Sequence, residues 1–138
     1  MGDGSVKCVM VISESLPVGL AVNAAGVLAA TLGRKVESLV GPDVVDGSGE
    51  RHAGLVKIPI PVLRADEEEI RAVRSRAAGV EGLLVVDVTQ TAQSSRTYEE
   101  YEDKMSLMQP DGLGYLGVAL YGEKRSVNKL TGNLPLLR

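Results

Sequence analysis

Three stretches of the chain are apolar at almost every position, which is the pattern of strands buried on both faces. They are residues 6–13 (VKCVMVIS), 82–90 (GLLVVDVTQ) and 115–121 (YLGVALY). Such strands lie in parallel or mixed sheets, because helices then shield both sides of each strand from water. The pattern therefore predicts one sheet built around these three segments.

Two further strands are predicted at residues 36–46 and 55–63. The sequence DGSGE between them has the composition of a turn, so the two strands are expected to form a hairpin. Pro59 and Pro61 cannot donate to a strand ladder, which places the second strand at a sheet edge or breaks its end.

Polar and apolar positions with helical spacing follow the predicted hairpin. The clearest helix covers residues 66–79, where Asp66 and Glu69 can form a capping box and Gly79 ends the helix. Another helix is predicted at 97–108, and the tail after Tyr121 holds one short helix.

The first helix is predicted between Pro17 and Gly33 and has a different composition. Residues 18–30 read VGLAVNAAGVLAA, and Asn23 is their one polar residue. A helix that is apolar on every face is usually buried, so this helix is expected to be enclosed.

The resulting order of elements, β-α-β-β-α-β-α-β, predicts a three-layer α/β/α sandwich with a mixed sheet of four to five strands. The length of 138 residues suits a single domain covering residues 1–138.

Composition narrows the class of protein. The chain is 44% hydrophobic and carries a net charge of −3, which argues against a nucleic-acid partner. One cysteine cannot form an internal disulfide, so a reducing, cytoplasmic location is expected. The apolar run at 18–30 is too short to span a bilayer, so no membrane association is expected.

Several familiar motifs are rejected. GLGYLG at 112–117 matches a dinucleotide fingerprint but leads into a strand instead of a helix. His52 is the only histidine, in a polar hairpin, and Cys8 lies in a buried strand, so neither a thiol nor a zinc site is predicted. No cofactor and no metal are expected. Lys124, Arg125 and Lys129 are interpreted as a solvated basic face.

Asp87 and Asn23 are the polar residues that remain to be explained. Asp87 lies near the end of a buried strand, where ligands bind in α/β folds. A buried amide needs hydrogen-bond partners, so Asn23 either faces a cleft opposite Asp87 and Thr91 or bonds nearby backbone. Asp87 could equally cap the loop that follows it.

Several segments together resemble the type 2 peptidyl-tRNA hydrolases in order and spacing. They are VKCVMVIS, SLPVGLAVNAAGVLAA, GLLVVDVTQTAQ and GVALYGEKRSVNKLTGNLPLL. Over its full length the chain is similar to an uncharacterised bacterial family, a domain of unknown function with a hydrolase-like fold. The resemblance implies that fold and a site near the first helix.

The residues carried over from the hydrolases differ at the charged positions. Gly19 is retained, but the hydrolase lysine position reads Leu20. Asp87 and Thr91 match the first and last residues of the hydrolase Asp-Ala-Gly-Arg-Thr segment, whose arginine is Gln90 here. Both changes remove positive charge that a phosphate or a developing oxyanion would need. The usual hydrolase activity is therefore predicted to be absent.

Three functions remain open at this point. The first is a hydrolase of aminoacyl or peptidyl esters, with Asp87, Thr91 and Asn23 as catalytic residues. The second is a non-catalytic protein that binds a small polar ligand in the same cleft, to which Gln93 would contribute. The third is a homodimeric interaction protein whose contact surface contains Tyr98, Tyr101, Met105 and Met108.

Overall fold

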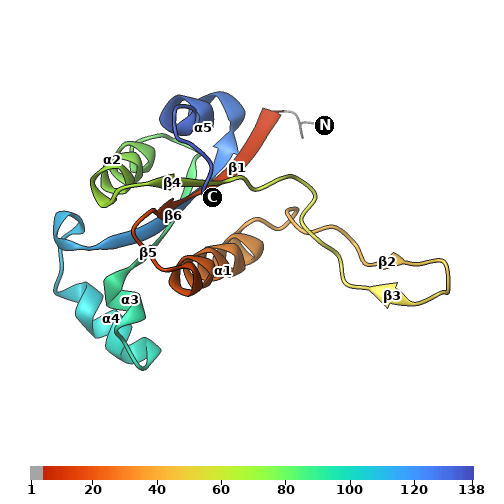
Figure 1. Ribbon diagram of the computed structural model, residues 1–138, viewed down its shortest axis with the longest axis horizontal. Helices are drawn as coiled ribbons and strands as arrows, with labels where there is room; N and C mark the ends of the chain where they lie inside the picture. Colours follow the sequence, from red (N-terminus) through yellow and green to blue (C-terminus); the bar gives the residue numbers. More distant parts are fainter. Residues whose placement is uncertain (1–4) are drawn as a thin grey trace.

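A computed structural model describes residues 5–138 of the chain (Figure 1). The elements follow in the order β1 (Val6–Ser13), α1 (Val18–Lys35), β2 (Val44–Val45), β3 (Arg51–His52), β4 (Val62–Ala65), α2 (Glu67–Ala78), β5 (Leu84–Thr89), α3 (Gln90–Gln93), α4 (Tyr98–Ser106), a 3-10 turn (Pro110–Gly112), β6 (Tyr115–Glu123) and α5 (Lys124–Thr131).

The main sheet has four strands in the order β4-β1-β6-β5. Strand β1 runs parallel to β4, and β6 runs antiparallel to both β1 and β5. The predicted mixed sheet is thus confirmed. Strand β4 lies at the edge and begins directly after Pro61, as expected of a segment that contains two prolines.

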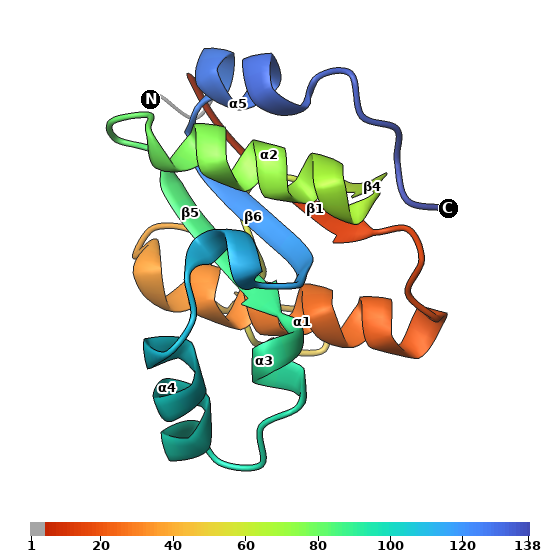
Figure 2. The ribbon, with the colours of Figure 1, turned by 90° about the vertical axis from the view of Figure 1, so that its left-hand side faces the viewer.

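Helices cover both faces of this sheet (Figure 2). Side chains alternate along β1, so that Cys8, Met10 and Ile12 pack with α1 on one face. Val9 and Val11 pack with α2 and α5 on the other face. The predicted α/β architecture with two helical layers around a sheet is therefore observed.

The prediction of two long strands at 36–46 and 55–63 is wrong. Val44–Val45 and Arg51–His52 form a separate two-stranded sheet, Val40 and Val56 form an isolated bridge, and of the second predicted strand Val62 and Leu63 belong to β4. Residues 40–57, here called the arm, project from the body beyond α1 (Figure 1). The predicted turn is present, because Asp46 Oδ1 accepts from the backbone N–H groups of Ser48 and Glu50 over 2.8 and 3.1 Å.

The prediction that α1 is enclosed is also wrong. Four residues on its inner face are buried, namely Ala21, Ala24, Leu28 and Leu32. The outer face is open: Val18 is 82% exposed and Val22 is 66% exposed. A helix that is apolar on every side does not reveal by periodicity which side is covered.

After α5 the chain returns along β4. The N–H of Arg64 donates to the carbonyl of Pro135 over 2.9 Å, and the N–H of Leu137 donates to the carbonyl of Val62 over 2.8 Å. Within residues 5–138, no helix combines the length and the apolar character needed to cross a membrane.

Candidate functional site

Asn23 and Asp87 lie on opposite faces of the sheet. Asp87 is on the α2 face, where its Oδ2 accepts from Nε of Arg74 over 3.4 Å. Asn23 is exposed on α1, which packs on the other face. The prediction that the two groups face one cleft is therefore wrong, and the structure does not bring them together.

The surroundings of Asp87 are aromatic and cationic. The guanidinium groups of Arg71 and Arg74 lie 5.5 and 5.9 Å from the centroid of the Tyr115 ring. The Tyr115 hydroxyl donates to the carbonyl of Pro110 over 3.1 Å. Burial raises the pKa of Tyr115, an effect that the nearby Arg74 opposes. Burial, with the charge of Asp87, also raises the pKa of Tyr101.

Thr91 is engaged in packing between α3 and α4. Its hydroxyl donates to Sδ of Met108 over 3.4 Å, and its carbonyl accepts from the Ser95 hydroxyl over 2.7 Å. No hydrogen bond joins Thr91 to Asp87 in the described part of the chain. The Thr89 hydroxyl is buried and has no partner among residues 5–138. Thr91 therefore bonds the segment that follows α4 and not Asp87.

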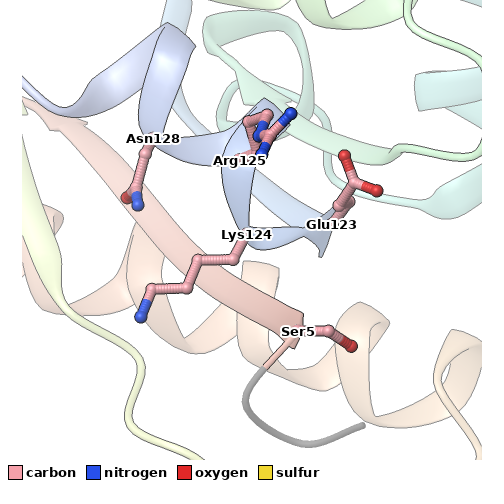
Figure 3. Close-up of a pocket in the computed structure, with 5 residues that line it drawn as sticks. All are labelled: Ser5, Glu123, Lys124, Arg125 and Asn128. Carbon is pink, nitrogen blue, oxygen red and sulfur yellow. The ribbon is translucent and has the colours of Figure 1, made fainter.

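A surface hollow lies where β6 passes directly into α5 (Figure 3). It measures about 660 Å³ and is here called the α5 hollow. The residues that line it are Ser5, Glu123, Lys124, Arg125 and Asn128. Lys124 and Arg125 both line the hollow, and their side chains diverge from the first turn of the helix (Figure 3).

The charges around the α5 hollow are unusual for the start of a helix. The positive end of the helix dipole normally attracts acidic residues, as the first turn of α2 shows with Glu67–Glu69. The first turn of α5 contains no acidic residue and begins with Lys124 and Arg125. Within residues 5–138, neither cation makes an ion pair or a side-chain hydrogen bond.

A third cation approaches the same helix from β1. Nζ of Lys7 donates to Oδ1 of Asn128 over 2.6 Å. The residue that precedes α5, Glu123, makes no side-chain cap bond to the first turn. The backbone N–H groups of that turn are therefore not capped by a side chain, and they add to the positive potential of the lysines and the arginine.

The sequence did single out Lys124 and Arg125, but as a solvated face. The sequence shows that basic residues are dense in this segment, but it does not show that these two residues begin a helix. The signal that could have located them is GEKR directly after a buried strand, because a strand that enters a helix without a loop puts its next residues in the first helical turn.

A second polar cluster lies at the tip of the arm, where no metal site was expected. One ligand atom each from Asp46, Glu50 and His52 lie within 4.8 Å of one another, and all three residues are exposed. Asp46 Oδ2 lies 2.7 Å from Nε2 of His52. Hydrogen bonds from His52 and Ser48 hold the pKa of Asp46 well below its usual range. These bonds close the turn and account for the cluster.

Comparison with known proteins identifies a family and a solved structure that are both described as being of unknown function. The model of a protein family described as "Protein of unknown function (DUF2000)" matches residues 6–138. A solved structure of a protein of unknown function from Agrobacterium tumefaciens strain C58 is similar, with a TM-score of 0.88 and 20% sequence identity. The match covers 96% of this chain and 97% of that chain and shows a shared fold. No curated protein matches the chain.

Proposed function

The chain belongs to the DUF2000 family, and from that premise we propose that it is a non-catalytic protein that binds a small phosphate-bearing ligand. The proposed site is the α5 hollow. The observation that carries the proposal is the pair of unpaired cations, Lys124 and Arg125, in the first turn of a helix that lines this hollow.

The lining of the α5 hollow combines two cations, Lys124 and Arg125, with one carboxylate, Glu123, so its side chains carry a net positive charge that suits a phosphate. The Arg125 guanidinium can offer two parallel N–H donors, while the Lys124 ammonium acts as a point charge. The uncapped N–H groups of the first helical turn point outward along the helix axis and favour an anion. The hollow is open to solvent and its volume of about 660 Å³ leaves room for a phosphate group.

A small ligand is favoured over a nucleic acid by the distribution of charge. A nucleic acid requires an extended basic stripe, because its phosphates repeat along the strand. Here α5 carries three cations, but the first turn of α2 on the same side of the sheet is acidic and two of the α2 arginines, Arg71 and Arg74, are ion-paired with carboxylates. The net charge of the whole chain is −3.

The proposal includes a fold like that of the type 2 peptidyl-tRNA hydrolases, without their reaction. Leu20 stands where the resemblance places a lysine, and it cannot replace that charge. The carboxylate of Asp87 bonds Arg74 on the α2 face, whereas Asn23 is exposed on α1. The three predicted catalytic residues thus lack a common point at which a substrate carbonyl could lie.

Calorimetric titration tests this function with inorganic phosphate and ribose 5-phosphate as probes and ribose as their uncharged control. We expect both phosphates to bind and ribose not to bind. The double variant Lys124→Gln, Arg125→Gln should raise the dissociation constant at least about tenfold, which corresponds to about 1.4 kcal/mol.

Lys129→Gln is the matched control, because Lys129 is an exposed lysine of the same helix that does not line the hollow. Its affinity for phosphate should stay close to that of the unmodified protein. An equal loss of phosphate affinity in the control and in the double variant would mean that the effect comes from net charge and not from this site. Absence of phosphate binding would refute the proposal.

A further inference from the structure

The arm is an isolated two-stranded ribbon with apolar side chains on its surface. Strands β2 and β3 pair only with each other. Val44 is 58% exposed and Leu55 is 80% exposed, and Val40, Val45 and Val56 are also exposed. A lone hairpin is at best marginally stable in water, and a group of exposed apolar side chains is typical of an interaction site. The arm therefore lacks the support that a partner would supply.

The outer face of α1 is unpartnered in the same way. No charged residue occurs between Val18 and Gly33, although this face of the helix is exposed. Its centre is formed by Gly19, Gly26 and Gly33, and a Cβ added at any of them would meet no atom within 4 Å. Glycine is the least favourable residue after proline inside a helix. No contact within the described part of one chain requires glycine at these three positions.

The positions on this face are symmetric about Gly26. Gly19 and Gly33 lie seven residues to either side, and both are glycine. Val22 and Ala30 are likewise equidistant from Gly26, at four residues. An antiparallel copy of the same helix, centred on Gly26, would therefore place glycine against glycine and valine against alanine. Such a surface is complementary to itself, as an interface with two-fold symmetry requires.

The charges at the two ends of α1 differ. Arg34 and Lys35 occupy the last turn, whereas the first turn contains no acidic residue and Glu14, which precedes it, is ion-paired with Arg64 over 3.3 Å. An antiparallel pair keeps the two cationic ends apart, whereas a parallel pair would bring them together. The two helix dipoles also run in opposite directions, which favours this arrangement over a parallel one.

We propose that the protein is a homodimer in which α1 packs antiparallel against α1 of a second copy, across a two-fold axis at Gly26, and each arm lies on the other subunit. An 18-residue helix is about 27 Å long and about 10 Å wide, which provides roughly 270 Å². A standard interface needs about 800 Å² from each partner. The helix alone falls short of this area, so the proposed dimer requires contact from the arm, which projects from the body beyond α1 (Figure 1).

Light scattering over a series of concentrations tests the dimer. We expect the unmodified protein to be dimeric at micromolar concentration. Gly26→Leu should raise the dimer dissociation constant at least about tenfold, because the bulk of leucine separates the two helices. The arm variant Val44→Lys, Leu55→Lys should weaken the dimer as well.

Ala78→Leu is the matched control, since it also introduces a leucine at an exposed position of a helix, here α2. It should leave the dimer intact, and circular dichroism should show that all variants are folded. A monomeric unmodified protein would refute the proposal. A dimer that Gly26→Leu does not weaken, such as one formed through Tyr98 and Leu107 of the α4 region, would refute it too.

Cross-linking tests the position of the axis. In the proposed dimer the two copies of residue 26 face each other, whereas the two copies of residue 33 are about 21 Å apart along the helices. A short thiol cross-linker should therefore join two chains of Gly26→Cys but not two chains of Gly33→Cys. The native thiol, Cys8, is buried and gives little background. Equal cross-linking of both variants would overturn the assigned axis.

Discussion

Nε of Arg74 lies 3.4 Å from Oδ2 of Asp87, and this contact joins α2 to β5 on the face of the sheet opposite α1. The two side chains are 27% and 20% exposed, so the pair is mostly shielded from water. Arg74 also lies over the Tyr115 ring of the neighbouring strand. Asp87 therefore fixes a helix to the sheet, which is a structural role.

The first prediction concerns this pair. Asp87→Asn should lower the free energy of unfolding by about 1 kcal/mol, because the half-buried guanidinium of Arg74 loses its counter-charge and partial exposure limits the loss. Urea denaturation measures the change. Glu81→Gln is the control, since this exposed acid makes no ion pair within residues 5–138. Equal stability of Asp87→Asn and the unmodified protein would show that the contact contributes nothing.

The second prediction concerns catalysis. The unmodified protein should hydrolyse neither peptidyl-tRNA nor aminoacyl esters above the rate in buffer, because Leu20 supplies no charge to a developing oxyanion. Release of the free amino acid or peptide measures the rate. Turnover that falls sharply in Asp87→Asn would instead establish Asp87 as a catalytic residue.

The third prediction concerns the buried thiol. Burial raises the pKa of Cys8 from 9.0 to about 11. Between these values the unfolded chain releases a proton that the folded chain retains, so the free energy of unfolding falls as the pH rises from 9 to 11. The contribution is fully present below pH 9, and the loss amounts to at most about 3 kcal/mol.

Urea denaturation at pH 8 and pH 10.5 measures this loss. Cys8→Ala should lose less stability between the two pH values than the unmodified protein does, whatever its stability at pH 8. An identical loss in both proteins would mean that other groups, such as the tyrosines, account for the whole effect.

The sheet and its best capped helix could be predicted from local patterns. The strands at 6–13, 82–90 and 115–121 are apolar at nearly every position, and only burial on both faces explains such runs. The capping box of Asp66 and Glu69 is present as expected. These features depend on residues that are close together in the sequence, so local patterns are sufficient to predict them.

The arrangement of the predicted site residues could not be derived in this way. Asp87 and Val88 are adjacent in β5, so their side chains point to opposite faces of the sheet. The sequence does not show which of these two faces α1 covers. The exposure of α1 depends on what packs against it, and a helix that is apolar on all sides is compatible with burial on any side. The prediction of two long strands failed because the pairing between the two sides of the arm is interrupted. Besides the pairs of β2 with β3, the two sides are joined by the isolated bridge between Val40 and Val56.

A titration of the isotope-labelled protein with inorganic phosphate, followed by nuclear magnetic resonance of its backbone amides, tests the phosphate site most directly. We expect the amide signals of Lys124, Arg125 and Ser126, in the first turn of α5, to shift most and to saturate together. These shifts should disappear in Lys124→Gln, Arg125→Gln and persist in Lys129→Gln. Shifts centred elsewhere, such as on Arg71 and Arg74, or no saturable shift at all, would contradict the assignment of the α5 hollow as the ligand site.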